Sequence, residues 1–242
     1  YDPKPEDDVP IKFKNNRFAR LFEPIAELYE LPKYNEIDLT PYFAPFYMIF
    51  FGLALGDIGY GAFLLLVSTV FKALKKKSIS MTMRGTMSLV QILGASTMLC
   101  GLLQGGFFGY SIYEINSPFI NRLESMLYFD NAQMFTLSLI LGVVQIMFGM
   151  ILKIFNRIKQ FGFKHALSSI GWFVFLLSII VSYLYPPLMP MGGTIHSGVM
   201  IATGVLIVFF NSPGKNPLVN IGTSLWDAHN MATGLRGDTL SY

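Results

Sequence analysis

Polar residues recur at steps of three or four near the end of an otherwise apolar chain. They are Asp227, Asn230, Gly234, Asp238 and Ser241, with His229 and Arg236 on a neighbouring face. Steps of three and four place side chains on one face of an α-helix. A polar helix at membrane depth usually lines a path for an ion or a substrate. The spacing predicts such a path here, and a solvated or loop-like segment is the alternative interpretation.

Asp57 is the second residue whose position indicates chemistry, because it lies in the glycine-rich middle of the apolar stretch from Pro41 to Leu74. An ionised carboxylate in lipid is costly, so it must find hydrogen-bond donors or take up a proton. Asp57 is therefore either the cap of a structural turn or a group that handles ions. The stretch would be about 50 Å long as one helix, against a hydrocarbon core of about 30 Å. We expect two helices, 42–55 and 58–76, joined by a buried turn.

The other reactive residue types give no enzyme signature. His165, His196 and His229 lie far apart in the sequence, without the cysteine and carboxylate neighbours of a zinc site. There is no phosphate-binding loop and no nucleophile elbow. We therefore expect no catalytic residue, no metal and no cofactor. The single cysteine, Cys100, is expected to be packing material.

Glycines and neutral amides within the apolar stretches indicate contacts between helices. The glycines are Gly101, Gly105 and Gly109, with Gly52 and Gly56 as a further pair, and the amides are Gln91, Gln104 and Gln145. A glycine at every fourth position lets membrane helices approach closely, and an amide joins helices by hydrogen bonds. We expect both sets to be structural.

The composition is that of an integral membrane protein. Of the 242 residues, 52% are hydrophobic and only 14% are charged, and the mean hydropathy is +0.49. Further spans are expected at 86–109, 132–156, 166–185 and 195–210, followed by the polar-faced helix from about 218. We therefore predict an all-α fold, a polytopic transmembrane helical bundle with six to seven membrane helices, the first two forming a short hairpin.

Basic residues gather in alternate loops. They follow the hairpin, lie between the spans 132–156 and 166–185, and precede the last helix, whereas the loop 185–193 has none. The positive-inside rule places the basic loops in the cytoplasm. Because the charges lie in short loops beside apolar segments, they indicate topology rather than binding to nucleic acid.

The first 40 residues are expected to form a separate segment before the transmembrane domain 41–242. Apolar residues recur there at helical spacing between several prolines, which predicts an amphipathic elbow at the membrane surface. Pro24 is expected to begin a second short helix, because a proline ring breaks the interior of a continuous one. A disordered arm is the alternative.

Three blocks of the sequence carry a resemblance to a known family. They are Phe22-Glu-Pro24 with Glu27-Leu-Tyr29, the run from Leu31 to Asp38 and Pro41; Phe51-Gly52 with Gly56-Asp57-Ile-Gly59-Tyr60-Gly61; and Gly237-Asp238-Thr-Leu-Ser241-Tyr242. In this order they resemble the membrane domain of the large stator subunit of V/A-type rotary ATPases, called subunit I in prokaryotes and subunit a in eukaryotes. The short loops are similar to the prokaryotic form.

The resemblance implies a fold of eight membrane helices, preceded by a large cytoplasmic domain that lies outside this chain. Such a subunit has no catalytic activity of its own. It holds two offset half-channels for H⁺ or Na⁺ against a rotating proteolipid ring, and so couples ion translocation to ATP hydrolysis or synthesis. The implied partners are that ring, the peripheral-stalk and central-stalk subunits, and the lipid of the prokaryotic cell membrane.

The resemblance also suggests site residues. The family pattern Ser-Tyr-x-Arg would place an essential arginine two residues past Tyr242, so we expect the chain to stop within the seventh helix. His229, Asn230, Thr233 and Ser241 are suggested as lining of the cytoplasmic half-channel. A secondary transporter, which predicts a second broken helix in a matching half, and a membrane anchor or scaffold for a cytoplasmic assembly remain as rival hypotheses.

Overall fold

The computed structural model describes residues 13–29, 32, 36–75, 78–211, 220–226, 229–230 and 233, which are helical almost throughout. The elements are η1 (Ala19–Phe22), α1 (Glu23–Tyr29), α2 (Thr40–Leu55), α3 (Ile58–Leu74), α4 (Met81–Gln104), β1 (Gly106–Phe107), β2 (Tyr110–Ser111), η2 (Ile112–Glu114), α5 (Pro118–Leu127), α6 (Asn131–Phe161), α7 (Phe163–Leu184) and α8 (Thr194–Phe209). Residues 220–226 are also helical.

The described part of the chain contains three helical stretches that are long and apolar enough to cross a membrane. They are Met81–Gln104, Pro118–Phe161, which contains α5 and α6, and Phe163–Leu184. The helices α2, α3 and α8 are apolar but shorter. The predicted class, an all-α membrane protein, is confirmed. The number of six to seven membrane helices stays a prediction.

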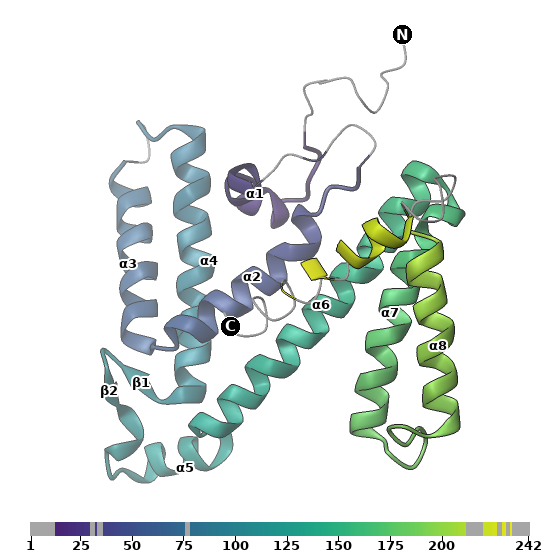
Figure 1. Cartoon of the computed structure of the whole chain (residues 1–242). Coiled ribbons are helices and arrows are strands. Elements are labelled where there is room, and N and C mark those ends of the chain that lie inside the picture. The colour runs from purple at the N-terminus through teal and green to yellow at the C-terminus, as the bar shows by residue number, and fades with distance from the viewer. Residues whose placement is uncertain are drawn as a thin grey trace. The chain divides into compact units, whose positions relative to one another are not determined.

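The chain divides into two compact units. The first is built mainly from Asp38–Ile140 with the amino-terminal segment, and the second mainly from Leu141–Ser241. In the first unit α2 and α3 are joined by a tight turn, as predicted. Both helices pack against α4 rather than chiefly against each other, and Figure 1 shows α3 and α4 side by side. The predicted hairpin is therefore present in the chain order, but α4 supplies its packing surface.

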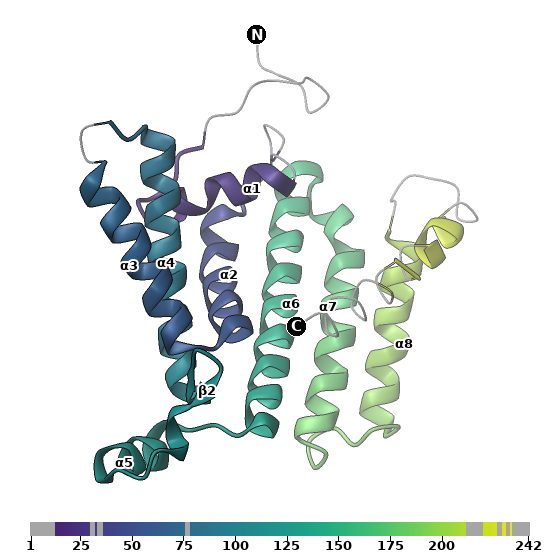
Figure 2. The ribbon, with the colours of Figure 1, turned by 90° about the vertical axis from the view of Figure 1, so that its left-hand side faces the viewer.

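The amino-terminal elbow packs on α2 and α4 through Phe22. This side chain is fully buried in a cluster with Ala44, Leu89 and Leu93, and its ring makes edge contacts with Phe43. As expected, Pro24 lies in the first turn of a separate helix, α1, which crosses the end of α2 in Figure 2. The disordered alternative is wrong for residues 19–29, which are helical.

The connection between α4 and α6 differs most from the prediction. A span to residue 109 was expected, but α4 ends at Gln104, because Gly105 takes a left-handed conformation with φ 74° that caps the helix. Gly109, with φ 82°, belongs to the tight connection between β1 and β2. Of the three glycines predicted to pack helices, Gly101 does so, whereas Gly105 and Gly109 shape turns.

The helix α6 begins with a reciprocal pair of hydrogen bonds. The N–H of Gln133 donates to the Asp130 carboxylate (2.8 Å), and the N–H of Asp130 donates to the Gln133 side chain (3.0 Å). This capping box satisfies two donors that a helix start leaves free. The helix then runs for 31 residues, about 46 Å, which exceeds the hydrocarbon thickness of about 30 Å.

Candidate functional site

Asp57 lies in the turn between α2 and α3, where it is only 5% exposed. One carboxylate oxygen, Oδ1, accepts from the N–H of Tyr60 (2.9 Å) and the N–H of Phe108 (3.0 Å). The other, Oδ2, accepts from the N–H of Gly109 (2.9 Å). Asp57 is thus the N-cap of α3 and at the same time holds the β1–β2 connection, so both of its oxygens are occupied structurally.

Glycines make room for this turn. Gly56 ends α2 in the left-handed conformation with φ 45°. A Cβ atom on Gly101 would lie 2.6 Å from the backbone carbon of Asp57, and one on Gly59 would overlap the ring of Phe108. Backbone therefore lies directly against backbone where α4 passes the turn.

A second polar cluster joins α3 to α4. The Lys72 ammonium donates to Ser88 Oγ (2.9 Å) and Gln91 Oε1 (2.8 Å), and the Gln91 amide donates to Thr69 Oγ1 (2.7 Å). Gln104 donates from α4 to the carbonyl of Leu53 in α2 (3.0 Å). The predicted role of Gln91 and Gln104 in joining helices is confirmed.

Gln145 does not follow the same pattern. Its buried Oε1 has no hydrogen-bond partner among the residues that the structure describes. Its predicted role in joining helices therefore stays a prediction.

In the second unit, small polar residues line the contact between α7 and α8, which lie side by side in Figure 1. Ser182 Oγ lies 3.1 Å from Nδ1 of His196, a histidine that is only 7% exposed. Ser168 Oγ donates to the carbonyl of Ile207 (3.4 Å). The sequence patterns did not single out this face, because serines at helical spacing in an apolar span are also typical of plain close packing.

The helix 220–226 is anchored to the carboxyl end of α8. Asn220 donates to the carbonyl of Phe209 (2.7 Å), and Ser224 donates to the carbonyls of Ile207 (3.2 Å) and Val208 (2.9 Å). The last carbonyls of a helix lack partners within it, so these side chains satisfy groups that would otherwise stay free. Sequence reasoning missed both anchors, since their partners lie on the preceding helix.

Three of the four predicted channel residues lie further along the chain, among the described residues. His229, Asn230 and Thr233 are helical and exposed, and Thr233 Oγ1 donates back to the carbonyls of His229 (2.9 Å) and Asn230 (3.1 Å). Residues 229 and 233 are one turn apart, so they share a face. Ser241 lies outside the described residues, as do Asp227, Gly234, Arg236 and Asp238 of the predicted polar face.

The described residues contain no group of three or more His, Cys, Asp or Glu side chains that could hold a metal ion. The polar groups of the described sites instead bind backbone atoms and one another. Their chemistry is that of helix attachment, together with one exposed polar helix face.

Comparison of the sequence with known proteins finds relatives among ATP synthase subunits. No protein-family model matches the chain. It is 32% identical to the A-type ATP synthase subunit I of Methanothermobacter thermautotrophicus, over 87% of this chain and 31% of that protein. It is 25% identical to the A-type ATP synthase subunit I of Methanocaldococcus jannaschii, over 99% of this chain and 38% of that protein.

A bacterial relative gives the same result. The chain is 25% identical to the V-type ATP synthase subunit I of Borreliella burgdorferi, over 89% of this chain and 36% of that protein. The chain therefore spans between 31% and 38% of the length of these three relatives.

Proposed function

Because the chain belongs to the family of subunit I of A-type and V-type ATP synthases, we propose that it forms ion half-channels against the rotating proteolipid ring of a rotary ATPase. In this role it is a multi-pass stator subunit of a prokaryotic cell membrane. It couples the movement of H⁺ or Na⁺ to ATP hydrolysis or synthesis. Stalk subunits bind it through the part of the protein outside this chain.

The observation that carries the proposal is a set of three polar residues near the end of the chain that are helical and exposed. These residues are His229, Asn230 and Thr233, and the ring of His229 lies 6.3 Å from that of Trp226. Earlier in the chain, Asn220 and Ser224 fasten the helix 220–226 to α8. A polar face in an apolar chain needs water or a polar partner. Next to the rotating ring, an anchored polar surface of this kind would provide a stationary, hydrated lining through which ions could enter.

The lining of such a half-channel must meet a strict physical requirement. A rotor carboxylate that faces lipid while charged costs several kcal/mol, so the stator must supply water where the ion enters and leaves. Moving one charge across 100 mV is worth about 2.3 kcal/mol, so a free leak would dissipate the gradient. The helix must therefore be polar on one face and firmly packed on the other, which is the role proposed here for the anchors on α8.

The test uses the intact ATPase complex carrying His229→Leu, Asn230→Leu or Thr233→Val, reconstituted in vesicles. An apolar side chain would exclude water from the proposed ion path. We therefore expect ATP-driven ion uptake to fall at least several-fold while the subunits still co-purify. Uptake is followed with a pH-sensitive dye and, in parallel, with radioactive Na⁺.

The matched control is Ile201→Ala, because Ile201 is 70% exposed on α8 and has no polar role. It should transport at the wild-type rate. Unchanged uptake in all three test variants would refute the proposed lining and leave the membrane anchor as the better hypothesis.

A further inference from the structure

A short amphipathic helix, α5, interrupts the connection between α4 and α6. Over its ten residues the apolar side chains are Phe119, Ile120, Leu123, Met126 and Leu127, and the polar ones are Asn121, Arg122, Glu124 and Ser125. The apolar side chains follow the helical period and share one face. On that face Phe119 is 74% exposed and Met126 is 73% exposed. Two large apolar side chains are therefore left uncovered by the described part of the chain.

Hydrogen bonds fix this helix to the end of α4. The N–H of Phe129, just after α5, donates to the carbonyl of Leu103 in the last turn of α4 (2.9 Å). Before α5, the hydroxyl of Tyr113 donates to the carbonyl of Leu102. Burial raises the pKa of Tyr113 and the nearby Glu124 carboxylate raises it further, so the hydroxyl stays protonated and able to donate. Figure 2 shows α5 beyond the ends of α3 and α4, below β2.

The two neighbours of α5 in the chain set its depth. The helix α4 is long and apolar enough to cross a membrane, and α6, which begins at Asn131, is the apolar core of the second such stretch. At ten residues, about 15 Å, α5 is too short to cross a hydrocarbon core of about 30 Å. A helix held between the ends of two crossing helices must therefore lie at the membrane surface.

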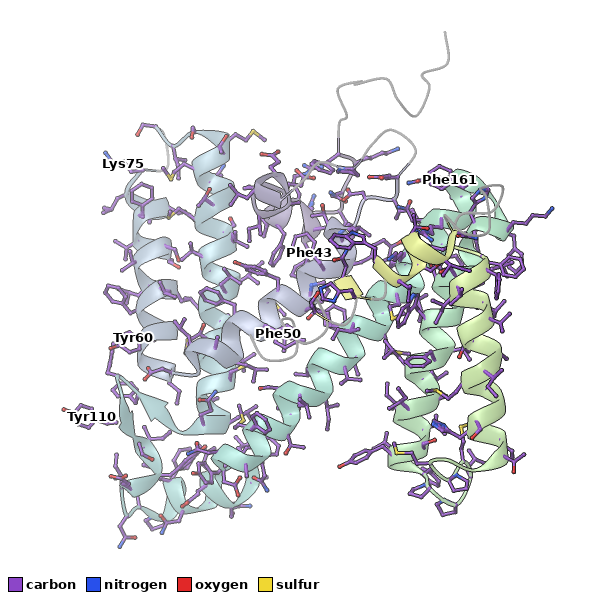
Figure 3. All side chains as sticks on the ribbon, in the orientation of Figure 1. Phe43, Phe50, Tyr60, Lys75, Tyr110 and Phe161 are labelled. Carbon is purple, nitrogen blue, oxygen red and sulfur yellow. The ribbon has the colours of Figure 1, made fainter. Side chains whose placement is uncertain are left out.

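Aromatic residues surround the same place. Tyr110, which projects from β2 in Figure 3, is 80% exposed, and Tyr128 and Phe129 after α5 are 42% and 38% exposed. Tyrosine is enriched at the boundary between lipid and water, because its ring is apolar and its hydroxyl is polar. Within α5 itself Arg122 and Glu124 balance each other in charge, while the acidic Glu114 and Asp130 lie outside the helix in the connection. The apolar face of α5 therefore has no excess charge of its own that would select a charged protein partner.

We propose that α5 lies flat on the lipid bilayer, with Phe119 and Met126 inserted at the boundary between headgroups and acyl chains. The polar face, with Asn121 and Ser125, is turned to water. The occupant of the apolar face is thus lipid. The inference does not depend on the ion path and would stand if that proposal failed.

Single cysteines carrying a nitroxide spin label test this arrangement. In the intact protein, with Cys100 and any cysteine outside this chain replaced by alanine, the label is placed at Phe119 or Met126, and for the matched controls at Asn121 or Ser125. After reconstitution in vesicles, collision rates are measured with oxygen, which collects in lipid, and with a water-soluble nickel complex. Ile140, exposed on α6, calibrates lipid, and Ser78, exposed before α4, calibrates water.

We expect the ratio of oxygen to nickel collisions at 119 and 126 to be several-fold higher than at 121 and 125, and close to the value at Ile140. Equal ratios on both faces, near the value at Ser78, would show that the apolar face is in water and would overturn the proposal. Low collision rates with both reagents at 119 and 126 would show a protein partner instead, and would overturn it as well. All four positions are exposed, so the labels leave packing intact, and circular dichroism checks the helix content.

Discussion

Asp57 joins three parts of the first unit through one carboxylate. Its oxygens accept from Tyr60 in α3 and from Phe108 and Gly109 beyond α4. A buried carboxylate is stable only when donors replace the water it loses, and three backbone N–H groups do so here. The bonds therefore explain why an acid is tolerated inside an apolar stretch. They favour a structural role for Asp57 over ion handling.

Asp57→Asn and Asp57→Leu should separate these roles. Asparagine keeps an oxygen for Tyr60 and Phe108 and loses only the acceptor for Gly109, so we expect a loss of about 1–2 kcal/mol and intact assembly. Leucine leaves three N–H groups without a partner, which costs roughly 3 kcal/mol or more and should impair assembly. The rate at which a thiol dye labels buried Cys100 on heating reports the unfolding. If both variants unfold like the wild type, the cap is not structural.

Gly101 gives a second prediction. A methyl group at Gly101 would overlap the amide nitrogen of Ile58 and lie 2.6 Å from the backbone carbon of Asp57. Since backbone cannot move as a side-chain end does, Gly101→Ala should destabilise the first unit by about 1–3 kcal/mol. Gly149→Ala on α6 is the control, because nothing lies within 4 Å of its added Cβ, and it should be neutral or slightly stabilising. Equal thermal stability of the two variants would refute the close contact.

Among the helices, α4 has the widest role, since α2, α3 and the elbow all pack on it. Apolar length and the run Gly56-Asp57 were enough to predict the helices and the turn, because a 34-residue stretch is too long for one span. The packing partner could not be predicted, since lipid-facing and helix-facing sides are equally apolar. Residues 105–127 were missed because Gly101, Gly105 and Gly109 have the spacing of a packing motif, and strands of two residues have no period.

The polar residues near the end of the chain could likewise be predicted only in part. The family resemblance suggested His229, Asn230 and Thr233 as channel residues, and the structure describes these three positions as helical and exposed. Their suggested contact with ions stays a prediction. The anchors Asn220 and Ser224 carried no signal, because a hydrogen bond to a carbonyl of another helix leaves no mark in the sequence.

The attachment of helix 220–226 to α8 leads to a prediction about local stability. Asn220→Ala and Ser224→Ala each remove donors to the last carbonyls of α8, at roughly 1 kcal/mol apiece. Amide hydrogen exchange across residues 220–226 should become about fivefold faster in each variant and faster still in the double variant. Gly222→Ala, with nothing within 4 Å of the added Cβ, is the control. Exchange at the wild-type rate in the double variant would show that other contacts hold this helix.

Each of the two units of the molecule has its own internal polar cluster, one around Asp57 and one at the α7–α8 contact. The hydrogen bonds described for each cluster are made by residues of the same unit. This separation fits a membrane protein, in which buried polar groups hold helices together where water is absent. The loops between the apolar helices bear on how the chain would be threaded through the bilayer.

The alternation of basic and non-basic loops predicts which loops face the cytoplasm. Cysteines introduced at Ser78 and Phe161 should react with a membrane-impermeant maleimide from the cytoplasmic side only, because both positions lie beside basic loops. Cysteines at Asn116 and Met191, in the intervening connections, should react from the opposite side only. Inside-out and right-side-out vesicles provide the two measurements. Labelling of Ser78 and Met191 from one side would contradict the predicted topology.

The bonds to Asp57 also bear on how the protein is made. Phe108 and Gly109 lie 51 and 52 positions after the carboxylate they hold, so they leave the ribosome only after the whole of α4 has been translated. When the turn between α2 and α3 is translated, only the donor from Tyr60 follows closely, and the other two arrive with the hairpin after α4. A nascent chain that stops before Phe108 has made all of α2, α3 and α4 and still lacks the bonds that close them.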